Sequence, residues 1–152
     1  MRKTTWMLLG GTIILLVACS SEVIGPSQVT LDGLRLDLEL NRASVERQES
    51  LVATVRIENL NEQPVELVSS CTALTLIKTF RGGDRVDLVG TVLGCGDAIT
   101  PFVIEGGATL TESFEIRAVR QGGQPVEKGR YVLRAEFMVV ELPDLEVSFR
   151  VE

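Results

Sequence analysis

Hydrophobic and polar residues alternate along most of this chain, as they do in strands that bury one face of a sheet. The clearest case is Leu34 to Leu40, where four leucines alternate with Arg35, Asp37 and Glu39. No window sustains the 3.6-residue period of an amphipathic helix. Alternation or β-branched runs predict further strands at residues 51–59, 65–69, 72–80, 85–90, 109–119, 129–140 and 145–151.

Turn-forming clusters separate the predicted strands at short intervals. Each cluster is rich in Gly, Pro, Asn or Asp, the residues that turns require. Short strands with a turn every eight to twelve residues are typical of an antiparallel β-sandwich, and a closed barrel is the alternative. The clusters are Asn59–Pro64, Arg81–Asp84, Glu105–Ala108, Gln121–Pro125 and Glu141–Asp144.

The amino terminus has a different pattern. Arg2 and Lys3 precede an uncharged apolar run from Trp6 to Ala18. A helix of that length rises about 20 Å, which is short of the ~30 Å hydrocarbon core of a bilayer. A basic start, a short apolar stretch and a small residue at the boundary indicate an export signal. We therefore expect residues 1–18 to be a signal peptide, with an uncleaved signal anchor as the alternative.

The end of the apolar run, Leu16-Val17-Ala18-Cys19, resembles the lipobox of bacterial lipoproteins. That resemblance implies that the chain is cut before Cys19 and that the Cys19 thiol carries a lipid. We expect residues 19–31 to be a lipidated tether, because they include Gly25-Pro26 and show no clear period. The folded domain is then expected over 32–152, on the extracytoplasmic side of a membrane of the cell envelope.

Charge and composition limit what the domain could do. The chain has 15 basic and 21 acidic residues and no histidine. A cut before Cys19 removes Arg2 and Lys3, which leaves 13 basic and 21 acidic residues and a net charge of −8. Such a surface disfavours nucleic acid and anionic lipid. Without histidine, the common catalytic triads and metal ligands are missing, so we expect no enzyme, no cofactor and no metal site.

The remaining two cysteines, Cys71 and Cys95, are 24 positions apart. Since Cys19 is assigned to the lipid, an even number of thiols reaches an oxidising compartment, which favours a disulfide. Unpaired structural thiols are the alternative. A closed loop of about 25 residues would stabilise the fold by roughly 3–4 kcal/mol on the chain-entropy model.

Several of these features together resemble a known family. They are Asn59, Pro64-Val65 between strands, Gly107 before a strand, and Gly129-Arg130-Tyr131 at the start of a late strand. Over residues 34–152 the chain resembles the immunoglobulin-like domain of the BsuPI-type proteinase-inhibitor family and related domains of bacterial lipoproteins. The resemblance implies an immunoglobulin-like antiparallel β-sandwich, of roughly seven or eight strands by the spacing above. It assigns no inhibitory residue to this chain.

Two functions follow as hypotheses. The first is a membrane-anchored module that binds or assembles with an envelope protein through loops or sheet edges. The alternative is a proteinase inhibitor that inserts a rigid loop into a protease. The candidate loop is Gly94–Phe102, next to Cys95, and it could equally be an ordinary connection pinned by the disulfide. Its candidate contact residues are Gly94, Asp97, Thr100 and Pro101.

Overall fold

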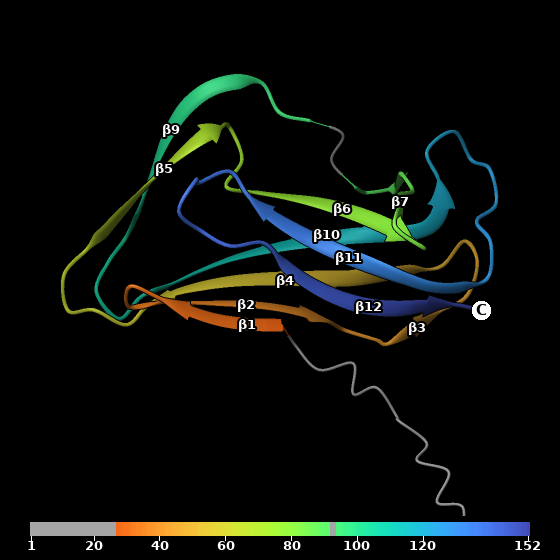
Figure 1. Ribbon diagram of the computed structural model, residues 1–152, viewed down its shortest axis with the longest axis horizontal. Coiled ribbons are helices and arrows are strands. Elements are labelled where there is room, and N and C mark those ends of the chain that lie inside the picture. The colour runs from red at the N-terminus through yellow and green to blue at the C-terminus, as the bar shows by residue number, and fades with distance from the viewer. Residues whose placement is uncertain (1–26, 92–93) are drawn as a thin grey trace, which may run out of the picture.

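The computed structural model describes residues 27–91 and 94–152, so the predicted signal peptide and Cys19 lie outside the described residues. The described part of the chain consists of strands joined by turns and contains no helix. Two five-stranded sheets face each other, and a separate two-stranded ribbon lies at one end of them (Figure 1). The first sheet has the order β1 (Ser27–Leu31), β2 (Leu34–Leu40), β4 (Ser50–Asn59), β10 (Thr109–Arg120) and β8 (Leu88–Val89). The second has the order β3 (Ser44–Val45), β12 (Leu145–Val151), β11 (Gly129–Phe137), β6 (Thr75–Arg81) and β7 (Asp84–Arg85).

The strand order is that of an immunoglobulin-like β-sandwich, the fold that the resemblance implies. The order β2-β4-β10-β8 corresponds to strands A-B-E-D of that fold, and β12-β11-β6 corresponds to G-F-C. All the strand pairs are antiparallel except β3 with β12, where the chain crosses from the first sheet to the edge of the second. The strands outnumber the expected seven or eight because short edge segments such as β3 and β7 carry too few residues to show alternation.

The core lies between the sheets and is built from the alternating apolar positions. Leu36 and Leu38 of β2 and Leu133 of β11 are fully buried. Phe149 of β12 stacks on Tyr131 of β11, with their ring centroids 5.5 Å apart. Burial of such aliphatic and aromatic side chains supplies most of the favourable free energy of folding.

Tyr131 closes the turn that leads into β11. Its side chain is 1% exposed, and its hydroxyl group donates a hydrogen bond of 2.8 Å to the main-chain oxygen of Glu127. Burial raises the pKa of this phenol, which keeps the donor protonated. A tyrosine near the start of strand F that bonds a few residues upstream is the tyrosine corner of immunoglobulin-like sandwiches. The Gly129-Arg130-Tyr131 segment therefore has a structural role.

The prediction of a tether over 19–31 is wrong for residues 27–31. These residues form β1, which pairs with β2 from Ser27 opposite Leu38 to Leu31 opposite Leu34. Asp32 and Gly33 turn the hairpin with φ values of 49° and 78°, the two positive values that a type I′ turn needs. The sequence pattern did not predict this strand, because the strand is short and directly follows Gly25-Pro26, which is typical of a linker.

Candidate functional site

The ribbon consists of β5 (Val65–Cys71) and β9 (Asp97–Ile104), which pair antiparallel. β5 belongs to the connection between β4 and β6, and β9 to the connection between β8 and β10. In Figure 1 the yellow-green β5 and the green-teal β9 extend together from one end of the sandwich. Within residues 27–91 and 94–152 these two strands pair only with each other, so the ribbon is an addition to the immunoglobulin-like framework.

The two faces of the ribbon differ in character. Toward the core, β5 buries Leu67, and β9 buries Ile104. On the opposite face, Val68 is 51%, Ile99 83% and Val103 59% exposed. Val68 lies directly opposite Pro101, which is also exposed. We call the outward surface formed by Val68, Ile99, Pro101 and Val103 the ribbon face.

The expectation that Gly94–Phe102 is a loop is wrong from Asp97 onward, where β9 begins. Asp97 lies opposite Cys71 and Thr100 opposite Ser69 in the ladder, while Gly94 is exposed and precedes the strand. Glycine and proline suggested a loop, but proline is accepted on an edge strand where its nitrogen faces away from the partner. The four candidate residues are therefore near one another in sequence but do not form a projecting loop.

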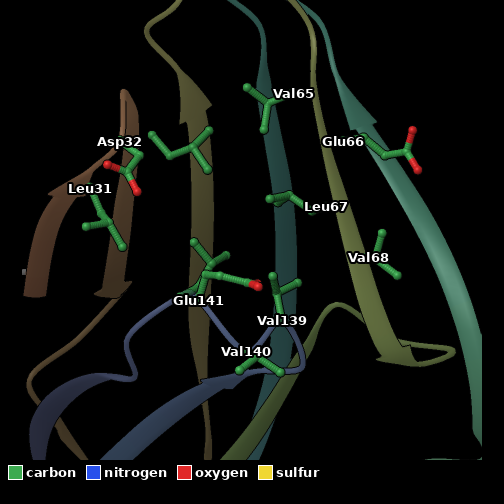
Figure 2. Close-up of a pocket in the computed structure, with 11 residues that line it drawn as sticks. Leu31, Asp32, Val65, Glu66, Leu67, Val68, Val139, Val140 and Glu141 are labelled. Carbon is green, nitrogen blue, oxygen red and sulfur yellow. The ribbon is translucent and has the colours of Figure 1, made fainter.

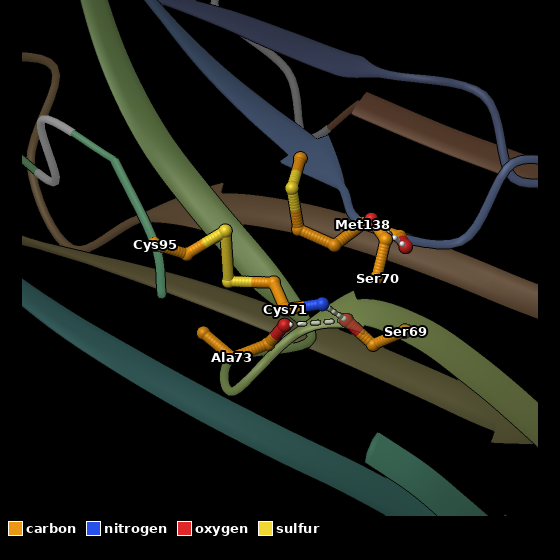
Figure 3. The surroundings of a disulfide bond; sticks show 6 residues. All are labelled: Ser69, Ser70, Cys71, Ala73, Cys95 and Met138. Atoms are coloured by element: carbon orange, nitrogen blue, oxygen red, sulfur yellow. Dashed lines mark hydrogen bonds between the residues drawn. A yellow bond between two sulfur atoms is a disulfide. The ribbon is translucent and has the colours of Figure 1, made fainter. Parts of the chain in front are cut away.

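Cys71 and Cys95 form a disulfide, as the sequence predicts, with their Cα atoms 5.7 Å apart (Figure 3). The bond links the end of β5 to the residues just before β9. Next to it, the Ser69 hydroxyl group accepts a hydrogen bond from the Cys71 N–H group and donates one to the Ala73 oxygen. The Ser70 N–H group donates a 3.0 Å bond to the Met138 oxygen, which ties β5 to the chain after β11.

Asn59 fixes the other end of the ribbon. This residue is fully buried at the end of β4, and its amide nitrogen donates to the main-chain oxygens of Gln63 at 2.8 Å and Ile104 at 3.0 Å. Its amide oxygen accepts a 3.0 Å bond from the Asn61 N–H group. The side chain of Asn59 therefore joins the end of β4 in the sandwich to Ile104, the last residue of β9. The resemblance drew attention to Asn59, but the pattern alone did not reveal this role.

A pocket of about 380 Å³ lies beside the ribbon, between β5, the β1–β2 turn and the connection from β11 to β12 (Figure 2). Its walls are mainly apolar, and three carboxylate residues, Asp32, Glu66 and Glu141, also line it. Val140, which lines it too, is 93% exposed. Sequence reasoning missed this pocket because its walls come from three distant segments. The apolar lining residues are Leu31, Leu34, Val65, Leu67, Val68, Val139, Val140 and Leu142.

Two further findings concern the part of the chain that the structure describes. No group of three or more His, Cys, Asp or Glu residues there is arranged to hold a metal ion. No helix in the same part is long and apolar enough to cross a membrane.

Comparisons with known proteins add little about activity. No family model matches the chain, and no curated protein matches it. Among solved structures, a β-glucosidase from Erythrobacter marinus is 16% identical, with a TM-score of 0.48 over 76% of this chain and 15% of that one. An alkylpurine DNA glycosylase from Pseudomonas fluorescens is 12% identical, with a TM-score of 0.47 over 81% and 31%. A β-glucosidase from Listeria innocua is 15% identical, with a TM-score of 0.43 over 76% and 16%. The chain spans less than a third of the length of each of these proteins.

Proposed function

We propose that this chain is a lipid-anchored protein of the cell envelope whose immunoglobulin-like domain binds another protein. The anchor rests on the lipobox-like Leu16–Cys19 segment after the short apolar run. The binding role rests on the ribbon. The composition supports a contact function, since an acidic domain without histidine lacks the usual groups for hydrolytic catalysis.

The exposed ribbon face is the observation that carries the proposal. Val68, Ile99 and Val103 are three of the six large apolar side chains that are most exposed in the described chain, and they share one small surface. A monomer gains nothing in stability from apolar side chains held in water, and such patches commonly mark protein-binding sites. The patch is also rigid, because the disulfide and the Asn59 hydrogen bonds fix both ends of the ribbon. Rigid surfaces lose less conformational entropy on binding.

The direction of β1 is consistent with a membrane anchor at one end of the domain and a binding surface at the other. The chain enters the domain at Ser27 and reaches the β1–β2 turn at Asp32, about 17 Å further along the hairpin. Leu31 and Asp32 line the pocket beside the ribbon, so the ribbon lies toward the far end of β1 from Ser27. An anchor at Cys19 would therefore attach to the end of β1 away from the binding surface.

The anchor is tested by metabolic labelling with radioactive palmitate. We expect label on the wild-type chain and none on Cys19→Ser, while Cys95→Ser, which also loses one cysteine, remains labelled. Equal labelling of the wild type and Cys19→Ser would reject lipid attachment at this position.

The binding role is tested by photo-crosslinking in cells of the source organism. A photoreactive residue at Ile99 should give one discrete protein adduct, and the same residue at the exposed Glu46 should give none. Adding Val103→Asp should remove the Ile99 adduct without unfolding the domain. If no adduct forms, or if both positions give the same adducts, the ribbon face is not a binding surface.

A panel of serine proteases tests the alternative function. The full chain is added to each protease at increasing ratios, and residual activity is measured. We expect no inhibition, because most of the segment expected to be an inhibitory loop is the paired strand β9. Stoichiometric inhibition that Ile99→Asp abolishes would favour a proteinase inhibitor instead.

A further inference from the structure

The edge of β5 that faces away from β9 is open beside the pocket. Pro101 of β9 has no N–H group, so in the ladder it occupies a position whose nitrogen points away from β5. The residue opposite it, Val68, therefore directs its own N–H and C=O groups away from β9, and Glu66 does the same because strand residues alternate. Ser70, two residues further on, follows this pattern, since its N–H group bonds the Met138 oxygen on that side.

The open edge borders the apolar pocket. Glu66 and Val68 both line it, and their outward main-chain groups have no partner strand within the described residues. Exposed strand edges that carry unpaired N–H and C=O groups pair readily with another extended segment. Pockets beside such an edge then receive alternate side chains of the added strand, which gives sequence specificity. The next residue whose main-chain groups point outward is Ser70, and its N–H group already bonds Met138, so the open stretch is short.

The negative charge around the pocket favours a positively charged partner. Asp32, Glu66 and Glu141 line it, no basic residue does, and none of the three carboxylates forms an ion pair with another described residue. Other carboxylates on the sandwich do have such partners, for example Glu146 with Arg134. A second copy of this acidic chain would bring like charges together at this place. A basic segment complements the charge instead.

We propose that the edge of β5 binds an extended segment of a partner protein as an added strand. The segment places an apolar side chain in the pocket and carries Lys or Arg on either side of it, opposite Asp32, Glu66 and Glu141. This inference rests on the proposed binding function and adds to it the chemistry of the partner: a short, basic, β-forming peptide.

A synthetic peptide tests the inference directly. The probe is acetyl-Lys-Val-Thr-Leu-Thr-Val-Lys-amide with a fluorophore, titrated into the full chain in detergent micelles and followed by fluorescence anisotropy. We expect saturable binding that weakens as salt is raised, because exposed charges are screened. The same peptide with Glu in place of both Lys residues should have an affinity lower by a factor of at least about ten. Equal binding of the two peptides would overturn the assigned partner chemistry.

Backbone pairing is tested by two N-methylated peptides. One carries methyl groups on the Val and Leu nitrogens, and the other carries them on the two Thr nitrogens. A strand turns alternate N–H groups toward its neighbour, so one of these peptides should lose binding and the other should keep it. Equal affinities for both would show that no strand is added.

Two variants of the protein locate the edge. Val68→Pro removes the outward N–H group and should weaken binding about tenfold, whereas the matched control Val68→Thr keeps that group and should retain affinity. Glu66→Lys should likewise weaken binding of the basic peptide, and the exposed Glu46→Lys, with the same change in charge, should not. Circular dichroism and melting confirm that each variant is folded. Unchanged affinity in folded Val68→Pro would overturn the inference.

The outcomes separate this inference from the proposed function. If the basic peptide does not bind while crosslinking at Ile99 still gives an adduct, the inference about β5 falls and the binding function stands. If the peptide binds but no adduct forms in cells, the β5 edge is supported and the ribbon face is not. If sedimentation shows a dimer that Val68→Pro abolishes, the occupant is a second copy and the partner chemistry is wrong.

Discussion

The sandwich and the ribbon use the same alternation of side chains in opposite ways. In the sandwich, β11 turns Leu133 inward, and on its solvent side Arg134 pairs with Glu146. In the ribbon, the solvent side carries Val68, Ile99 and Val103, beside the exposed Glu66 and Ser70 of β5. A polar outer surface keeps a folded domain soluble. Exposed apolar side chains add neither solubility nor stability to the monomer, so their presence suggests a binding role. The sandwich is therefore accounted for by folding alone, and the ribbon is the part that points to a function.

The two regions also differ in what holds them together. The sandwich is stabilised by a continuous apolar core between its sheets. The ribbon depends on the Cys71–Cys95 bond at one end and on Asn59 at the other, with Leu67 and Ile104 packed beneath it. Changes in the two regions should therefore have different consequences.

The largest effect is expected in the sandwich core. Phe149→Ala removes a buried ring that stacks on Tyr131, and it should lower the free energy of unfolding by about 3–5 kcal/mol. Urea denaturation followed by circular dichroism measures the change. Val140→Ala, at a 93% exposed position, is the control and should change stability by less than about 0.5 kcal/mol. A loss below about 1 kcal/mol for Phe149→Ala would contradict the core described above.

Removal of the disulfide should have the next largest effect. The double variant Cys71→Ala/Cys95→Ala should lose roughly 3 kcal/mol in urea denaturation, because the unfolded chain gains the freedom of a closed loop. Hydrogen exchange should also quicken more in β9 than in β11. Cys19→Ser, which lies outside the described domain, should leave both measurements unchanged. Uniform acceleration across the sandwich would show that the ribbon is not a separate unit.

Asn59→Ala tests the junction of the two regions. It leaves the Gln63 and Ile104 oxygens and the Asn61 N–H group without this partner, so we expect a loss of about 2–3 kcal/mol. Faster hydrogen exchange near Ile104 should accompany it. Asn61→Ala is the control, since that side chain makes only a 3.3 Å bond to the exposed Asp32 oxygen. Equal losses of unfolding free energy in the two variants would show that the Asn59 side chain does not hold the ribbon in place.

The smallest effect on stability is expected on the ribbon face. Ile99→Thr with Val103→Thr keeps β-branched side chains, and it should change the free energy of unfolding by less than about 0.5 kcal/mol. The same variant should lose the crosslinked adduct formed from a photoreactive residue at Val68. A large loss of stability would mean that the face is part of the core and would remove the contrast with the sandwich.

The sequence predicts the sandwich well because each of its long strands carries its own signal. The segment 34–40 coincides with β2, and 145–151 coincides with β12, since period-two alternation is a local property of a half-buried strand. The disulfide was also predictable, because it follows from the count of cysteines and the expected compartment.

The ribbon and the pocket were less predictable because they depend on contacts between distant segments. β9 contains Pro101 and follows Gly94 and Gly96, which are local signals of a loop, and only its pairing with β5 makes it a strand. The pocket combines the β1–β2 turn, β5 and the connection after β11. No local pattern specifies that these three segments meet.

Pro101 has a consequence for how far the sheet could grow. A two-stranded ribbon with two open edges could add a strand on each side, and copies joined in this way would form a polymer. On the outer edge of β9, however, proline interrupts the row of N–H groups and would weaken pairing there. Each copy of this chain therefore offers one edge that favours pairing, that of β5, whereas a polymer of copies would need two such edges on every copy.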